Sequence, residues 1–295
     1  MVDTSNQPVA GQQSSTPQYD WQNPNLKKFD FGRVMSRTFQ GALHCGKESW
    51  LPLLLWFGLP MFIVSLWPLL LPDGAYGQLI TGGGFEGFED IFTPAVIIGA
   101  GLAYLVFIAI YMLLYIALSH NVYGFFNGSK PSFQESFRRG RARFWTTLGS
   151  SILFLIGIML GFLLLFIPGI ILMLGWYLMG PVLAMEDKGA AESLGRSWEM
   201  SKGSKRWILL LFIILSVISA VIGALFSIIT VPFGNQMTAF FEGGSTTFWV
   251  LYALATALSQ IIAVLLSIAG IASVYYEIRD VKEGAVQETL SAVFD

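Results

Sequence analysis

Residues 144–185 read FWTTLGSSILFLIGIMLGFLLLFIPGIILMLGWYLMGPVLAM and contain no Asp, Glu, Lys or Arg. A helix that crosses the apolar core of a bilayer needs about 20 residues, and this run is about twice that length. Pro168 and Gly169 interrupt the run near its middle. We therefore predict two membrane helices, 146–167 and 170–185, joined by a tight turn at Pro168-Gly169. A single long helix kinked at Pro168 is the alternative.

Charge-free runs elsewhere predict four more membrane helices, because an ionised residue near the centre of such a helix costs roughly 2.5–3.5 kcal/mol. These helices cover residues 50–72, 94–119, 207–231 and 247–276. Of all residues, 54% are hydrophobic and only 12% are charged, whereas a soluble domain carries about 25% charged residues. We expect an all-α, polytopic membrane protein with six transmembrane helices and interfacial amphipathic helices. Its predicted parts are a disordered cytoplasmic tail, 1–28, a membrane domain, 29–284, and a cytoplasmic C-terminal tail, 285–295.

The positive charges are confined to one side of this arrangement. All 17 Lys and Arg residues fall in segments 1–49, 120–145, 186–206 and 277–295. The two longer loops on the other side, 73–93 and 232–246, contain only acidic charges. Because positively charged loops stay in the cytoplasm, both termini are expected there. A single kinked helix over 144–185 would scatter the charge over both sides, so the six-helix arrangement is favoured.

Three units with a similar layout follow one another along the chain. Each contains an amphipathic segment, a Trp at the start of a membrane helix, and a Pro with a nearby Gly at its end. The three Trp-to-Pro pairs are Trp50 and Pro72, Trp145 and Pro168, and Trp207 and Pro232. This pattern indicates either a threefold repeat of an amphipathic helix plus a transmembrane hairpin, or ordinary interfacial Trp and turn residues.

The amphipathic segments differ in their polar faces. The first places Arg33, Arg37, Gln40, His44 and Lys47 opposite Phe31, Val34, Met35, Thr38, Ala42 and Cys45. The second begins with the capping pattern Ser132-Phe133-Gln134-Glu135. The third places Ala191, Leu194, Trp198 and Ser201 opposite Glu192, Arg196 and Glu199. We expect the face with Trp198 to be largely buried against the helix ends, with Arg196 near Glu186 or Glu277.

Reactive side chains are sparse. The two His and the single Cys form no metal-ligand spacing, and no nucleophile or phosphate-loop motif occurs. We therefore predict no catalytic residue, no metal and no cofactor, and the net charge of −2 gives no reason to expect nucleic acid. Glu186 and Glu277 are either an ion gate or interfacial carboxylates paired with Arg or Lys. Gly157, Gly161, Gly175 and Gly180 indicate close helix packing or, less favoured, a substrate path.

Three stretches resemble a known group of proteins. They are Phe31 to Phe39, Pro181 to Gly203 with Glu186 and Arg196-Ser197-Trp198, and Tyr275 to Gly284 with Glu277 and Arg279. Together they resemble the bacterial membrane proteins grouped with the glycerophosphodiester phosphodiesterase membrane domain. The resemblance implies a bacterial inner membrane protein with a six-helix bundle. It does not imply hydrolysis, because the catalytic phosphodiesterase domain is absent from this chain. The candidate structural or interaction residues are Glu186, Arg196, Ser197, Trp198, Gly203, Glu277 and Arg279.

These observations favour a non-catalytic integral membrane module that interacts with lipids or partner proteins, or with copies of itself. Basic residues near a membrane surface attract anionic lipid. The candidate anionic-lipid contacts are Arg138, Arg139, Arg141, Arg143, Lys205 and Arg206. The alternative is a transporter or channel for a hydrophobic or amphipathic substrate. A polar cavity across the bundle would favour transport, and a dry aliphatic core would favour the module.

Overall fold

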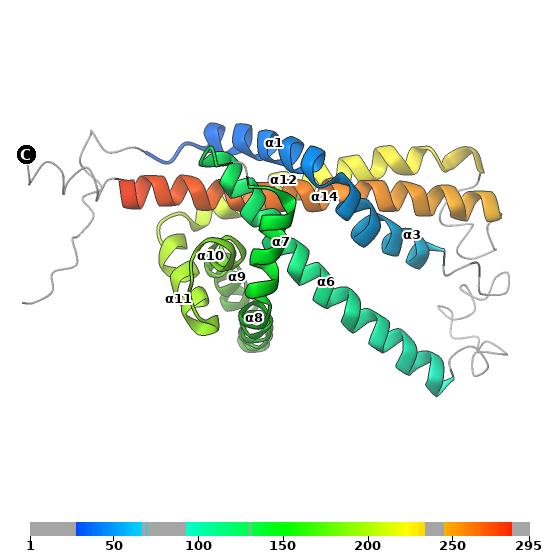
Figure 1. Cartoon of the computed structure of the whole chain (residues 1–295), viewed down its shortest axis with the longest axis horizontal. Helices are drawn as coiled ribbons and strands as arrows, with labels where there is room; N and C mark the ends of the chain where they lie inside the picture. Colours follow the sequence, from blue (N-terminus) through cyan, green and yellow to red (C-terminus); the bar gives the residue numbers. More distant parts are fainter. Residues whose placement is uncertain (1–27, 67–68, 70–92, 130, 234–244, 285–295) are drawn as a thin grey trace, which may run out of the picture.

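The computed structural model describes residues 28–66, 69, 93–129, 131–233 and 245–284 (Figure 1). Within these residues the chain is helical and has no strand. The two predicted tails, apart from Lys28, and most of the two loops 73–93 and 232–246 lie outside the described residues. The elements are α1 Phe31–Glu48, α2 Trp50–Leu53, η1 Leu54–Gly58, α3 Leu59–Ser65, α6 Pro94–Phe126, α7 Phe133–Ala142, α8 Phe144–Leu164, α9 Phe166–Gly175, α10 Met179–Met185, α11 Ala190–Ser201, α12 Lys205–Ile228, η3 Val231–Phe233, α14 Thr246–Arg279 and η4 Asp280–Gly284.

The helices confirm the predicted fold class. Among the described residues, five stretches are long and apolar enough to cross a membrane, and the bent pair formed by α1 and Trp50–Ser65 makes a sixth if it is one span. The pair is bent by 88°, so the amphipathic helix and the membrane helix that follows it point in different directions. α6 has 33 residues and α14 has 34. At the helical rise both are about 50 Å long, well over the ~30 Å of a hydrocarbon core.

The first amphipathic face is confirmed. α1 begins after Asp30, whose side chain accepts a hydrogen bond from the backbone N–H of Arg33 and so caps the helix. Its buried residues are Val34, Thr38, Ala42 and Cys45, all on the predicted apolar side, together with Gly41. This face packs against α14 and α6. The polar face carries Arg33 and Arg37, which are only half-buried.

The turn between α8 and α9 lies three residues before the predicted position. Leu165 alone is extended, with φ −167° and ψ 151°, and separates the two helices. Pro168 instead lies in the first turn of α9, where a proline is tolerated because its missing N–H would have no helical partner. The predicted helix 170–185 is also broken, since α9 ends at Gly175 and α10 begins at Met179.

The predicted end of the second membrane helix at residue 119 is too early, because α6 continues to Phe126. The polar residues that suggested an end are accommodated by α7 and the segment before it. His120 Nδ1 lies 3.1 Å from Ser136 Oγ. Asn121 Nδ2 donates a hydrogen bond of 2.9 Å to the carbonyl of Pro131. These contacts allow the helix to continue through a polar stretch.

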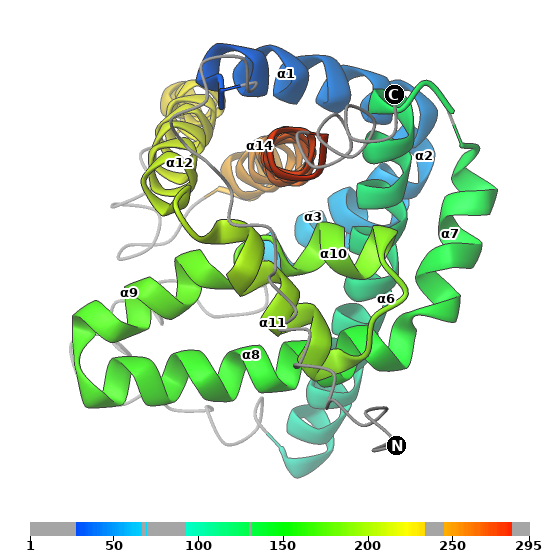
Figure 2. The same ribbon diagram turned by 90° about the vertical axis from the view of Figure 1, so that its left-hand side faces the viewer.

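The three predicted units follow one another in the expected order but pack unequally. α14 lies at the centre, with α1, α12, α6 and α10 arranged around it (Figure 2). The hairpin of α8 and α9 lies crosswise to α14, so that it is seen end-on in Figure 1 and side-on in Figure 2. Its tip, from Leu163 to Ile167, is strongly exposed and entirely apolar, as expected for a surface that contacts lipid tails.

The predicted packing role of the glycines is confirmed. A Cβ on Gly157 would lie 2.4 Å from the ring of Trp176. One on Gly175 would lie 2.1 Å from the ring of Trp198. One on Gly161 would lie 3.0 Å from the backbone of Gly169. Close approach of helices and aromatic rings at these points requires that no side chain be present.

Candidate functional site at the basic end

The basic end of the molecule comprises α1, α7, α11, the loop 186–189, the start of α12, and the C-terminal part of α14 with η4. Among the described residues, the charged side chains lie in these elements or in the short segments directly next to them. The networks within it join elements that are far apart in the sequence. They decide which of the candidate residues are tied to the fold and which face outward.

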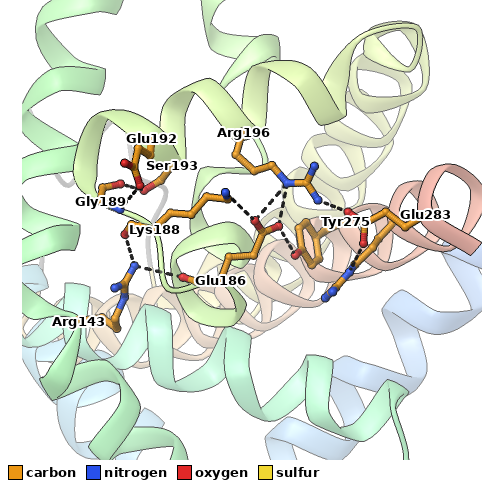
Figure 3. A network of polar contacts seen from close by, with 10 residues as sticks. Arg143, Glu186, Lys188, Gly189, Glu192, Ser193, Arg196, Tyr275 and Glu283 are labelled. Atoms are coloured by element: carbon orange, nitrogen blue, oxygen red, sulfur yellow. Dashed lines mark hydrogen bonds and ion pairs between the residues drawn. The ribbon is translucent and has the colours of Figure 1, made fainter. Parts of the chain in front are cut away.

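Arg196 lies at the centre of the first network (Figure 3). Its Nε donates to both carboxylate oxygens of Glu186, at 3.0 and 3.1 Å. Its Nη2 donates to Glu283 from the other side. Glu186 also accepts a hydrogen bond of 2.9 Å from the hydroxyl of Tyr275. The predicted proximity of Arg196 to Glu186 is therefore confirmed, but the second carboxylate is Glu283 and not Glu277.

Arg279 extends this network to α6. Its Nε donates to Glu283 Oε2 at 2.7 Å, and its Nη1 donates to the hydroxyl of Tyr123 at 2.9 Å. Glu283 is thus held by two guanidinium groups. The network links α6, the end of α10, α11, α14 and η4 through charge-assisted hydrogen bonds, which are stronger than neutral ones.

The charges in this network stabilise one another. Burial opposes the charge on Arg196, but the hydrogen bonds that it donates to Glu186 and Glu283 outweigh this effect, so the pKa of Arg196 is raised. Burial also opposes the charge on Glu283, and the guanidinium groups of Arg279 and Arg196 outweigh that effect and lower the pKa of Glu283. Both partners therefore stay ionised at neutral pH, which is the behaviour of a structural ion-pair network.

Glu277 belongs to a second, separate network. Its side chain is fully buried, with 0% exposed. Arg33 Nη2 lies 2.6 Å from Glu277 Oε1, and Arg37 Nη1 lies 2.6 Å from Oε2. The backbone N–H of Asp30 donates to the same carboxylate at 3.1 Å. Two guanidinium groups and the start of α1 are thus tied to α14. Of the two carboxylates expected as alternatives near Arg196, Glu186 is therefore its partner, and Glu277 pairs with α1 instead.

Arg33 and Arg37 pair with a candidate residue, Glu277, but the candidate set did not include them. The sequence signal was present, since they stand four residues apart on one face of a helix. Nothing in the sequence indicated which carboxylate they face, because Glu277 lies 240 residues beyond Arg37.

The four arginines of α7 and its C-terminus divide into two pairs. Arg139 Nε donates to the carbonyl of Ala184 at 3.1 Å, and its guanidinium lies 2.9 Å from Asp187. Arg143 donates to the carbonyls of residues 186 and 188. Burial and the neighbouring charge of Arg139 lower the pKa of Arg143. Arg139 and Arg143 therefore hold the loop 186–189, while Arg138 and Arg141 are exposed.

The buried face of α11 is rotated from the predicted one. Its buried residues are Ser193, Leu194, Ser197, Met200 and Ser201. Ala191 is exposed, whereas Trp198 is half-buried and packs over Gly175, so the expected burial of this face is met only in part. The serines explain the rotation. The hydroxyls of Ser197 and Ser201 both donate to the carbonyl of Gly175, at 3.0 and 3.1 Å, and satisfy the end of α9.

The turn after α11 holds the remaining candidates. Gly203 has φ +80°, a left-handed conformation that favours glycine. Lys205 Nζ lies 3.5 Å from the centre of the Trp198 ring, a cation–π contact. Lys282 Nζ donates to three backbone carbonyls at the end of α11, those of Glu199, Met200 and Lys202. Arg206 is exposed, beside the ring of Trp207 at 5.3 Å.

The described residues form two concavities that are relevant to the candidate site. A shallow polar one of about 500 Å³ lies on α7 and is lined by Ser132, Gln134, Glu135, Phe137, Arg138 and Arg141. A larger and mainly apolar groove of about 630 Å³ lies between α6, α8, the α9–α10 break and α14. Tyr and Trp side chains, including Tyr111, Tyr115, Trp176 and Tyr177, line this groove.

Residues 100–278 match a family model described as a domain of unknown function (DUF7847). The match covers more than half of the chain and includes α6 to α14. The chain belongs to this family. No curated protein and no solved structure matches the chain. The family boundaries take in Arg196 and Glu277, together with the α7 arginines and the apolar groove, but leave α1 and η4 outside the matched region.

Proposed function

We propose that this member of the DUF7847 family is a non-catalytic, multi-pass module of the bacterial inner membrane. Its basic end faces the cytoplasm and binds anionic lipid headgroups. The observation that carries this proposal is the division of the α7 arginines. Arg139 and Arg143 are bonded to the loop 186–189, whereas Arg138 and Arg141 are exposed and have no ion pair with a described residue.

The surroundings of Arg138 and Arg141 fit a headgroup. Both line the shallow polar concavity on α7, beside the hydroxyl of Ser132. Trp145 follows α7 directly and is 78% exposed, as is common for an aromatic ring at the boundary between headgroups and acyl chains. Each basic residue near an anionic membrane surface contributes about 1 kcal/mol of attraction. Arg206 adds a further exposed charge beside Trp207.

The matched pairs of arginines provide the test. We expect the double variant Arg138→Gln/Arg141→Gln to retain less anionic phospholipid than the wild type after purification, with an unchanged melting temperature. The double variant Arg139→Gln/Arg143→Gln should lower the melting temperature, because carbonyls of the loop 186–189 lose their donors. Equal retention of anionic lipid by the first variant and the wild type would refute the proposal.

The orientation is tested by cysteine labelling in a Cys45→Ser background. Gly83→Cys and Gly244→Cys lie in the loops without Lys or Arg, and we expect both to react with an impermeant maleimide added outside the cell. Ser129→Cys and Lys202→Cys lie in basic segments and should react only after the membrane is permeabilised. Labelling of Lys202→Cys from outside, without labelling of Gly244→Cys, would reverse the proposed orientation.

A second candidate function is the transport of a hydrophobic or amphipathic molecule. The apolar groove supports it for an apolar substrate only, because the groove is lined by residues from charge-free runs and is not the polar cavity across the bundle that would favour transport in general. Transport would require a second state in which the groove opens toward the other side. Uptake of a labelled substrate into reconstituted vesicles, compared with empty vesicles, separates a transporter from a module that only binds.

A further inference from the structure

The apolar groove contains unpaired hydrogen-bond donors. Tyr111 and Tyr115 on α6 stack with their ring centres 6.2 Å apart, and Tyr177 lines the groove from the break between α9 and α10. No hydrogen bond joins their hydroxyls to a described residue. A hydroxyl within a hydrocarbon environment has no water to bond, and leaving it unpaired is costly. Three such groups in one groove point to a ligand with hydrogen-bond acceptors.

Gly180 positions one of these donors. A Cβ on Gly180 would lie 2.4 Å from the hydroxyl oxygen of Tyr115 and 2.3 Å from its ring. The Tyr115 side chain therefore lies directly over the backbone of α10, in space that any other residue at position 180 would fill. The ring is fixed by this contact and by Tyr111, so its hydroxyl is held in one place rather than free to turn away.

The remaining lining defines the shape and polarity of the ligand. The rings of Phe154, Trp176 and Tyr177 and the side chains of Met112, Leu183 and Ile271 form apolar walls, and every lining residue comes from a charge-free run. A volume of about 630 Å³ is typical of a small-molecule site. Ser267 stands ten residues before Glu277 on α14, so the groove lies about 15 Å along the helix from that buried carboxylate.

We propose that the groove binds a neutral apolar molecule with a flat ring that carries carbonyl groups, the chemistry of an isoprenoid quinone. The carbonyl oxygens would accept hydrogen bonds from the phenols of Tyr111, Tyr115 and Tyr177, and the ring would stack on the aromatic walls. An acyl chain would fill the same space but would leave all three hydroxyls unpaired. This proposal is independent of headgroup binding at α7, because it concerns a separate set of residues.

The probe is decylubiquinone, added to the purified protein in nanodiscs of uncharged lipid, with the rise in melting temperature as the readout. Decylbenzene has an apolar ring and the same tail length but no carbonyl groups, so it is the matched ligand control. We expect saturable stabilisation by decylubiquinone, with an apparent affinity at least about tenfold higher than that of decylbenzene, since each hydrogen bond accounts for about that factor.

The matched variants keep the rings and remove the donors. Tyr111→Phe and Tyr115→Phe should each weaken decylubiquinone binding about tenfold without changing the response to decylbenzene. Tyr276→Phe lies at the basic end and should bind as the wild type does. The melting temperature without ligand shows that each variant is folded. Equal stabilisation by the two ligands would show that the groove takes lipid tails only, and absence of stabilisation by decylubiquinone would equally overturn the proposal.

Discussion

The side chain of Arg196 donates to Glu186 through Nε, which lies 3.0 Å from one carboxylate oxygen and 3.1 Å from the other. Glu186 is the residue at which α10 ends, and Arg196 lies in the middle of α11. The contact therefore sets the angle of the connection between these two helices. Glu283 holds the other side of the guanidinium and brings η4 into the same arrangement.

We expect Arg196→Ala to lower the free energy of unfolding by about 2 kcal/mol, because Glu186 and Glu283 lose a charged donor while remaining partly buried. The measurement is thermal or denaturant unfolding of the detergent-solubilised protein. Arg138→Ala is the control, since Arg138 is exposed and has no ion pair with a described residue, and a change within about 0.5 kcal/mol is expected there. Equal effects of the two substitutions would contradict a structural role for Arg196.

Glu277 is expected to hold α1 against α14. The substitution Glu277→Gln removes a fully buried carboxylate that pairs with both Arg33 and Arg37, and among the described residues only Arg33 keeps another ion pair, with Asp30; we expect a cost of about 3 kcal/mol. α1 should then open more often. Amide hydrogen exchange over residues 31–48 measures this directly. Glu48→Gln, an exposed change at the end of α1, is the control. Unaltered exchange in α1 of the Glu277 variant would show that apolar packing alone holds the helix.

The lowered pKa of Glu283 predicts that the stability of the folded protein depends on pH. Its pKa is lowered in the folded protein, so the stability that the carboxylate contributes is complete above its ordinary pKa of 4.5 and is lost as the pH falls through the lowered value. At neutral pH the wild type should melt at a higher temperature than Glu283→Gln. The difference should shrink steadily below about pH 4.5, because the protonated carboxyl resembles the amide. A difference that is constant from pH 7 to pH 3 would exclude this charge effect.

Gly203 and Gly195 form a matched pair of glycines around α11. Gly203 has φ +80°, so Gly203→Ala should destabilise the protein by about 1–2 kcal/mol. Gly195 lies inside α11, is exposed, and has no atom within 4 Å of the place where a Cβ would be. Gly195→Ala should therefore stabilise the protein by about 0.5–1 kcal/mol, the difference in helix propensity. Melting curves of the two variants should shift in opposite directions, and a shift in the same direction would contradict the structure.

The membrane helices could be predicted well because their signal is local. A run without charge, such as 207–231, must be helical in a bilayer whatever lies beside it, since no water is present to bond its backbone. α12 at Lys205–Ile228 and α14 at Thr246–Arg279 agree with the predicted spans within a few residues. The exceptions were some helix ends and the break between α9 and α10 inside the predicted helix 170–185. His120 and Asn121 resembled a helix end, but the His120 ring and the amide nitrogen of Asn121 have partners in α7 and the segment before it, so α6 continues.

The candidate site was predicted less completely, because its contacts depend on tertiary structure. The sequence showed that Arg196 and Glu186 stand ten residues apart beside a helix end, and this nearby pair was confirmed. It could not show that Arg33 and Arg37 reach Glu277, since that pairing depends on which helix α1 crosses. It also could not show which arginines of α7 bond to the loop 186–189 and which are exposed, because the position of that loop decides the direction of each side chain.

The sequence by itself therefore determined the all-helical fold, the order of amphipathic and membrane helices, and the confinement of positive charge to one set of segments. Each of these follows from the cost of placing charge or unbonded backbone in hydrocarbon, which applies residue by residue. Only the tertiary structure decided that α14 lies at the centre, that α8 and α9 lie crosswise to it, and that three tyrosines share one groove. These features arise from side-chain packing between helices distant in the chain, where many arrangements are compatible with the same pattern of apolar and charged residues.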